Sequence, residues 1–288
     1  MFSGEVNILG SYWTLAGAAY PHTDREYSPF DFRDRVEAAS RVGFTGFGIW
    51  HADLDHVLKT YTLKEMRQIL DDNGMKFLEL EFIFDWFMEG ERKKKSDELK
   101  QKLLTAAEAL NATHVKVGDF FMEPCPMPKL IESFAALCAE AKGYGTKIVY
   151  ELMPFANVNT LDDLLTLLDG ADADNGGVIL DLWHIAKMRL PFEELRRIPL
   201  RHLLGVELND GMIENREDLH DETINHRLLC GEGEFDVPGF INLLHDMGYR
   251  GAWGIEVLNA EVREWPMDRI MERSFQTTKA QFDAAARG

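Results

Sequence analysis

The sequence predicts an α/β fold, a single (β/α)8 TIM barrel. Eight short apolar runs alternate with amphipathic stretches, and the repeat of about 30 residues suits a barrel of eight strand and helix units. Such a barrel typically needs about 250 residues, and this chain has 288. A hydrophobic content of 45% is enough to bury one large core. We therefore expect residues 1–288 to form one domain.

The predicted strands are short runs rich in apolar and β-branched residues, bounded by turn residues. In chain order they are Val6–Leu9, Gly46–Ile49, Phe77–Glu81, His114–Val117, Lys147–Glu151, Gly177–Asp181, Leu203–Leu208 and Ala252–Val257. Strands that alternate with helical segments favour a parallel sheet. An open doubly wound sheet is the alternative, but no GxGxxG or GxxxxGK[ST] motif follows any strand.

The segments between the strands have the apolar spacing of amphipathic helices. Helices are expected over residues 30–43, 62–74, 96–111, 128–145, 160–170 and 237–251, and from about residue 266 towards the C-terminus. Helix N-caps are expected at Ser96, Thr160 and Asp236, and glycines that end helices at Gly43, Gly74, Gly145 and Gly248. The charge run Glu89–Lys95 is interpreted as a solvated loop, and Asp210–Asp236 as a long irregular loop of functional importance.

The composition excludes several classes of partner. A formal net charge of -18 disfavours nucleic acid and anionic membrane surfaces, because such binding depends on Lys and Arg. No signal peptide or membrane-spanning run is recognised. The three cysteines form no CxxC pair, so neither a disulfide framework nor a zinc ribbon is indicated. We expect a cytoplasmic protein.

Acidic residues stand at the ends of the last four predicted strands: Glu151, Asp181, Glu207 and Glu256. The carboxyl ends of parallel barrel strands meet at one rim, where four carboxylates would repel one another. A cation between them would remove the repulsion. The pattern therefore predicts a divalent metal site.

Five segments of the second half resemble one family: VYELMP, VILDLWH, LLGVELNDG, HRLLCGEGEFD and WGIEV. In order and spacing they are similar to the sugar phosphate isomerase/epimerase family. These xylose-isomerase-like TIM barrels include ketose 3-epimerases, hydroxypyruvate isomerase, inosose dehydratase and endonuclease IV. The first half matches the family only in its general pattern. A nuclease activity is disfavoured by the acidic charge and by Glu207.

The resemblance implies metal ligands at Glu151, Asp181 and Glu256. The family's fourth ligand is usually a histidine, and Glu207 stands at that position here. An all-oxygen set favours Mn²⁺ or Mg²⁺ over zinc. Alternatively, His220 or His226 of the following loop supplies the fourth ligand, and Glu207 then contacts the ligands instead of the metal.

The resemblance also assigns roles in chemistry. The bound metal would stabilise an enediolate formed when a proton leaves the carbon next to a carbonyl. Glu151 and Glu256 match the family's two proton-transferring glutamates, one on each side of the sugar. His184 and Arg227 match positions that contact substrate.

Aromatic residues gather near predicted strand ends. They are Tyr12, Trp13, Trp50, Phe82, Phe84–Trp86, Phe120, Phe121 and Trp183. Such rings either stack on a sugar or flat aglycone or simply pack in the core, and both interpretations stay open. We take Trp13, Trp50, His51 and Lys116 as candidate substrate contacts. Without an obvious basic cluster, a neutral sugar, cyclitol or glycoside is expected rather than a sugar phosphate.

Three functions are compatible with these residues. The first is a metal-dependent isomerase or epimerase of a keto-sugar. The second is a lyase or dehydratase that uses the same enolate step on a keto-cyclitol or 3-keto-glycoside. The third is a non-catalytic or partner-dependent sugar-binding barrel. The expected partners are a small carbohydrate and either a second copy of the chain or another subunit.

Overall fold

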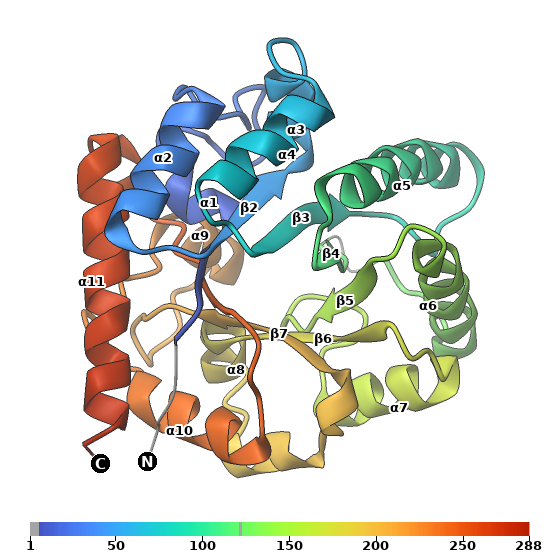
Figure 1. The fold of residues 1–288 in the computed structure, drawn as a ribbon. Helices are drawn as coiled ribbons and strands as arrows, with labels where there is room; N and C mark the ends of the chain where they lie inside the picture. Colours follow the sequence, from blue (N-terminus) through green and yellow to red (C-terminus); the bar gives the residue numbers. More distant parts are fainter. Residues whose placement is uncertain (1–5, 121–122, 288) are drawn as a thin grey trace.

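The computed structural model describes residues 6–120 and 123–287 and shows eight parallel strands closed into a barrel (Figure 1). The strands are β1 (Ile8–Gly10), β2 (Gly46–Trp50), β3 (Phe77–Ile83), β4 (His114–Val117), β5 (Lys147–Glu151), β6 (Gly176–Asp181), β7 (Leu203–Leu208) and β8 (Trp253–Ile255). Because β1 pairs with both β2 and β8, the sheet has no edge. The predicted (β/α)8 fold is confirmed, and the open doubly wound alternative is wrong.

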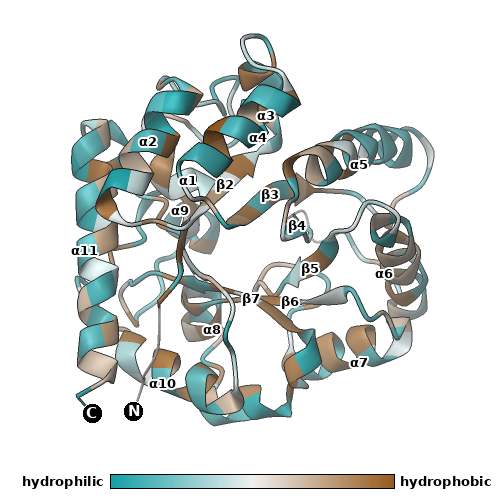
Figure 2. Ribbon diagram, viewed as in Figure 1, coloured by the Kyte–Doolittle hydropathy of each residue, from teal (hydrophilic) through white to brown (hydrophobic). Residues whose placement is uncertain are grey.

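Long helices surround the strands and follow the predicted amphipathic segments. They are α2 (Phe32–Val42), α4 (Leu63–Asp72), α5 (Gly90–Leu110), α6 (Met127–Lys142), α7 (Leu161–Ala171), α10 (Val237–Met247) and α11 (Met267–Ala285). Their apolar sides pack onto the barrel: in α2 the buried side includes Phe32, Val36 and Ala39. Hydrophilic and hydrophobic residues are interspersed along these helices, as expected for amphipathic segments (Figure 2). None of the described helices combines the length and apolarity that a membrane crossing requires.

Four short helices follow strands β1, β2, β6 and β7 and were not predicted. They are α1 (Tyr12–Leu15), α3 (His51–Val57), α8 (Leu182–Lys187) and α9 (Leu219–Asn225). The stretch Asp210–Asp236 is therefore not wholly irregular, because α9 lies inside it. Segments of four to seven residues are too short to show a helical period.

The start of α5 corrects the prediction for the charge run. The helix begins at Gly90, so residues 90–95 form its first turns instead of a loop, and Ser96 is not an N-cap. Ser96 lies within the helix, where its hydroxyl donates to the carbonyl of Phe84. Thr160 and Asp236 do cap their helices, each accepting a backbone N–H. Gly43 and Gly248 end α2 and α10 in the left-handed conformation, as expected for residues without a Cβ.

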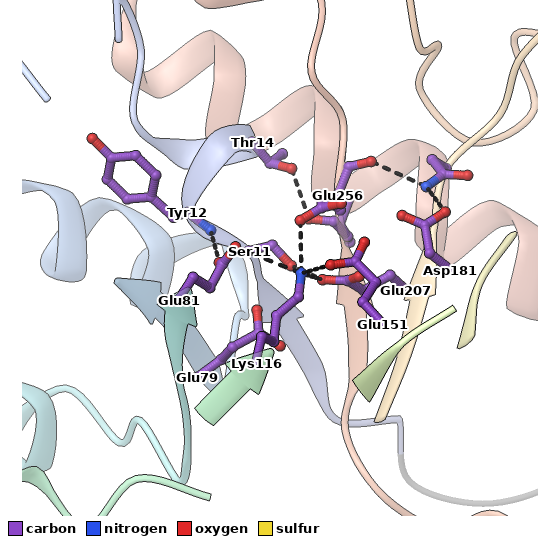
Figure 3. Close-up of polar contacts among 12 residues, drawn as sticks. Ser11, Tyr12, Thr14, Glu79, Glu81, Lys116, Glu151, Asp181, Glu207 and Glu256 are labelled. Carbon is purple, nitrogen blue, oxygen red and sulfur yellow. Dashed lines mark hydrogen bonds and ion pairs between the residues drawn. The ribbon is translucent and has the colours of Figure 1, made fainter. Parts of the chain in front are cut away.

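Polar side chains occupy part of the barrel interior. Along β3, the apolar Leu78 and Leu80 alternate with Glu79 and Glu81, which are also buried. Glu81 lies near Lys116 of β4 inside the barrel (Figure 3). Because successive strand residues point to opposite faces, one face of β3 packs on helices while the other carries charge.

Candidate active site

Four carboxylates meet at the carboxyl ends of β5, β6, β7 and β8. Glu151, Asp181, Glu207 and Glu256 are all buried, and each offers an oxygen within 4.8 Å of the others. The register places Asp181 directly beside Glu207, and Glu256 follows the last residue of β8 (Figure 3). The structure thus brings together all four residues that the sequence singled out as metal ligands.

Lys116 points from β4 into this group of carboxylates (Figure 3). Its Nζ lies 2.8 Å from Glu207 Oε1 and 3.0 Å from Glu256 Oε1. The distance from Nζ to the nearer oxygen is 3.5 Å for both Glu81 and Glu151. Burial by itself lowers the pKa of Lys116, but these four carboxylates outweigh it, and the pKa lies well above its usual value.

Arg227 is the second buried cation. Its Nη1 donates to Asp181 Oδ2 at 2.5 Å and to Glu256 Oε2 at 3.0 Å. The guanidinium is anchored from the other side by Thr223, whose carbonyl and hydroxyl both accept from Arg227 Nε at 3.1 Å. Arg227 therefore connects the carboxylates of β6 and β8 to helix α9.

His184 lies on α8, immediately after β6. Its Nε2 is 3.1 Å from Glu151 Oε1, and the ring is buried. Asp181 is the N-cap of this helix, because its Oδ1 accepts from the backbone N–H of Trp183 at 2.7 Å. Asn209 also donates to Oδ1, so Oδ2 is the oxygen of Asp181 that faces Arg227.

The environment separates the pKa values of these acids. Burial raises the pKa of Glu256 to about 7, although Lys116 and Arg227 act in the opposite direction. Burial and then the Glu256 charge raise the pKa of Glu207 well above its usual value. Burial also opposes ionisation of Glu151 and Asp181, but nearby cations outweigh it. The largest lowering effect comes from Lys116 at Glu151 and from Arg227 at Asp181, and the pKa values of both acids are lowered.

The donor set fits a hard divalent cation. Glu207 Oε2 is buried without any hydrogen-bond partner, which is costly unless a further positive group approaches it. Among the described residues, five buried carboxylates are paired with two permanent cations, Lys116 and Arg227. Oxygen-only ligands are those preferred by Mn²⁺ and Mg²⁺. An alternative set of three consists of Glu151, Asp181 and His184.

The two loop histidines lie away from this group. Within the part of the chain that the structure describes, neither His220 nor His226 belongs to a set of side chains close enough to share an ion. His226 pairs with Asp221 at 3.1 Å and is 34% exposed. His220 lies at the pocket wall beside His22. The geometry thus favours Glu207 over either histidine as the fourth donor.

A cavity of about 350 Å³ opens above the carboxylates. Its wall includes the predicted contacts Trp13, Trp50, His51 and Lys116, together with Glu151, His184, Arg227 and Glu256. The remainder of the wall combines polar side chains, among them His22, Glu26 and Asp85, with aromatic and apolar ones: Phe82, Phe84, Phe120, Phe155, Ile224 and Leu258. The cavity thus joins the carboxylate group to a wall that is partly aromatic and partly polar.

The aromatic residues divide between pocket and core. Trp13, Trp50, Phe82, Phe84 and Phe120 line the cavity. Three other aromatic residues, Tyr12, Trp86 and Trp183, pack in the interior. Phe121 lies outside the described residues. Core packing is therefore confirmed for the second group, and stacking on a sugar or aglycone stays a prediction for the residues that line the cavity.

Glu81 and His22 also line the cavity, although neither was predicted as a site residue. Glu81 Oε1 accepts from the backbone N–H of Tyr12 at 3.2 Å. A signal for Glu81 was present in the alternation FLELEFI, since two glutamates at period two inside an apolar strand must share one face. His22 follows β1 in a connection with no periodicity, so nothing in the sequence marked it.

Most of the chain matches a known protein family. The family described as xylose isomerase-like TIM barrel matches residues 36–281. The chain belongs to the xylose isomerase-like TIM barrel family. The resemblance seen in the sequence is confirmed.

Within this xylose isomerase-like family, the similar curated proteins are enzymes. The 3-dehydroshikimate dehydratase of Pseudomonas putida is 27% identical over 243 residues, which cover 81% of this chain and 37% of that protein. This chain therefore spans little more than a third of the dehydratase. The inosose isomerase of Halalkalibacterium halodurans is 25% identical over 234 residues, covering 78% of this chain and 82% of that protein.

Solved structures of xylose isomerase-like barrels share the fold at low identity. A crystal structure of IolI protein with a zinc atom matches with a TM-score of 0.81 at 18% identity, covering 98% of this chain and 99% of the other. D-allulose 3-epimerase from Methylomonas sp., in complex with D-allulose, matches with a TM-score of 0.72 at 16% identity, covering 97% and 98%.

Proposed function

We propose that this barrel is an isomerase or epimerase of a keto-sugar or related polyol ketone. The reaction removes a proton from the carbon beside the carbonyl and returns one to the same or the neighbouring carbon. The observation that carries the proposal is the pair Glu151 and Glu256. Both line the cavity, and their pKa values are shifted in opposite directions. Carboxylates with separated pKa values are suited to act as base and acid.

Glu151 is the proposed base, because its lowered pKa keeps it ionised at neutral pH. Glu256 is the proposed acid, because it lines the cavity together with Glu151 and its carboxyl group can return a proton to the substrate. His184, 3.1 Å from Glu151, holds that carboxylate in place. Arg227 faces the cavity beside Glu256 and would donate to a substrate oxygen that gains negative charge.

A divalent cation is the proposed cofactor, held by Glu151, Asp181, Glu207 and Glu256. When bound, it supplies Lewis-acid stabilisation of negative charge on a substrate oxygen. The unpartnered Glu207 Oε2 supports such a site, and the zinc of the IolI structure supports a divalent ion in a barrel of this kind. The oxygen-only donor set favours Mn²⁺ or Mg²⁺.

The pocket favours a substrate without phosphate. Among its described lining residues the only Lys and Arg side chains are Lys116 and Arg227, and both are already paired with carboxylates. Burial, and then Lys102, lower the pKa of His51 to about 4, so this ring is neutral. The aromatic sides would contact the apolar faces of a sugar, cyclitol or attached ring.

A lyase is the second candidate, favoured by the similarity to 3-dehydroshikimate dehydratases. The same proton abstraction would then be followed by departure of a group from the next carbon. Epimerisation and elimination share the residues named above and differ in whether a proton returns or a leaving group departs.

The test is exchange of substrate hydrogen in D₂O, followed by NMR on a panel of ketoses, inososes and 3-keto-glycosides. The wild-type protein, supplied with Mn²⁺ or Mg²⁺, should incorporate deuterium next to a carbonyl, and Glu256→Gln should reduce the rate at least ~100-fold. Glu132→Gln, an exposed change on α6, is the matched control. A dehydrated product or released aglycone would select the lyase. Sugar binding without exchange would select the non-catalytic barrel, as a lone chain or with a partner subunit.

A further inference from the structure

We infer that Lys116 is a resident cation of the carboxylate group, which competes with a divalent ion for the oxygens of Glu207 and Glu256 and so limits how tightly the ion binds. This inference rests on the proposed function only for the identity of the metal ligands. It concerns a residue of β4, whereas the four proposed ligands come from or follow β5 to β8.

The backbone fixes Lys116 in this position. The residue is the third of the four in β4, its side chain is 1% exposed, and Val149 of β5 is its neighbour in the register. Lys116 Nζ lies 2.8 Å from Glu207 and 3.0 Å from Glu256, and 3.5 Å from both Glu81 and Glu151. Lys116 is buried and in contact with these carboxylates, so the ammonium remains among them.

The contacts of Glu207 show which oxygens are taken. Ser11 Oγ donates to Glu207 Oε1 at 3.0 Å, and Lys116 Nζ donates to the same oxygen at 2.8 Å. Glu207 Oε2 is buried without a hydrogen-bond partner, so at this oxygen an ion would compete with no other donor. Lys116 and Ser11 thus leave Glu207 able to bind through one oxygen.

Both oxygens of Glu256 have a cationic partner. Lys116 occupies Oε1 at 3.0 Å and Arg227 occupies Oε2 at 3.0 Å. An ion that binds Glu256 at the roughly 2.0–2.6 Å typical of oxygen ligands would share an oxygen with one of these cations and so compete with it. Its positive charge would also lie close to the ammonium, and like charges repel strongly at buried sites. Lys116 therefore opposes ion binding by occupying an oxygen and by its charge.

The same arrangement has a consequence for the metal-free protein. Lys116 reduces the repulsion among the carboxylates, so the barrel does not depend on an ion for that purpose. Metal removal should then leave the fold intact, while removal of Lys116 should make the fold depend on metal.

The test compares Lys116→Met with Lys147→Met, using calorimetric titration with MnCl₂ at pH 7.5 and thermal unfolding with and without the ion. Lys147 is an exposed residue of β5, so its loss alters the net charge equally without touching the site. Lys116→Met should bind Mn²⁺ at least ~10-fold more tightly than the wild type. It should also show a lower Tm without Mn²⁺ and a larger rise in Tm on adding it. Unchanged or weaker Mn²⁺ binding by Lys116→Met would overturn the inference.

A second comparison covers the case in which Lys116→Met does not fold. Lys116→Met/Glu207→Gln removes one charge of each sign, and it should bind Mn²⁺ more tightly than Glu207→Gln alone. Equal or weaker binding would overturn the inference. If neither the wild type nor the variants bind Mn²⁺, both the inference and the proposed metal cofactor are wrong. If the wild type binds Mn²⁺ but the Lys116 variants do not bind it more tightly, only the inference about Lys116 is wrong.

Discussion

Lys187 Nζ lies 2.6 Å from Glu222 Oε1, and both side chains are buried. Lys187, on α8, also donates to the carbonyl oxygens of Met212 at 2.7 Å and Glu214 at 3.2 Å. Glu222 Oε2 accepts from the backbone N–H of Arg216 at 2.9 Å. The pair therefore ties the connection after β7 to the barrel, and this connection carries Arg227 into the site.

Breaking this pair should destabilise the protein strongly. Lys187→Met leaves a buried Glu222 carboxylate without its counter-charge, and such losses cost about 3–5 kcal/mol in free energy of unfolding. Lys187→Met/Glu222→Gln should recover part of that loss, because no unpaired charge remains. Urea denaturation of the single and double variants measures the difference. A double variant no more stable than Lys187→Met would show that the pair is not the source of the effect.

Arg227→Lys should not preserve function, although the charge is kept. The guanidinium contacts Asp181, Glu256 and Thr223 at once, and an ammonium lacks the planar fork that this requires. We expect deuterium exchange into substrate to slow at least ~100-fold, by analogy with loss of a donor to developing charge. Arg41→Lys, an exposed pair with Asp268, serves as the control. Wild-type exchange rates in Arg227→Lys would contradict the assigned role.

Metal binding should release protons below neutral pH. Glu256 has a pKa of about 7 and the pKa of Glu207 is raised, so protons and the ion compete for the same oxygens. Below pH 7 the affinity for Mn²⁺ should therefore fall by about tenfold per pH unit for each proton displaced. Titration calorimetry in buffers of different ionisation enthalpy counts the protons released. An affinity that is constant from pH 5.5 to 7.5 would refute this expectation.

His51 should make stability depend on pH. Burial first, and then Lys102, lower its pKa to about 4, while an unfolded chain has a histidine pKa near ~6.5. The folded state thus keeps the ring neutral, and its contribution is present above pH 6.5 and is lost as the pH falls towards 4. The drop in Tm between pH 7 and pH 5 should be smaller for His51→Asn than for the wild type. His226→Asn, at a partly exposed site, provides the comparison. If the Tm of His51→Asn changed with pH in the same way as the Tm of the wild type, this role of His51 would be contradicted.

The aromatic wall should affect substrate binding more than turnover. Trp13 and Trp50 line the cavity with ring centroids 4.9 Å apart, and neither side chain carries an acid or base that could transfer a proton at neutral pH. Trp13→Ala should raise KM several-fold with little change in kcat, which is the signature of lost uniform binding. Steady-state kinetics with the substrate found in the exchange assay would measure both constants. A fall in kcat with an unchanged KM would place Trp13 closer to the reacting atoms.

Much of the architecture follows from local patterns in the sequence. Apolar runs of strand length and amphipathic helices report on neighbours two to four residues away, and such signals are visible without a structure. The rim position of Glu151 and Asp181 also follows, because parallel strands deliver their carboxyl ends to one side. The helical start of α5 and the short α9 did not follow, since charged or short segments carry little periodicity.

The sequence by itself determined the barrel, its rim of carboxylates and the family. Only the tertiary structure decided how these carboxylates are neutralised. Lys116 and Glu207 are 91 residues apart in the chain, and Ser11 is 196 residues from the same glutamate. Which side chains meet inside a closed barrel depends on the register and tilt of all eight strands, and no local pattern of residues records that geometry.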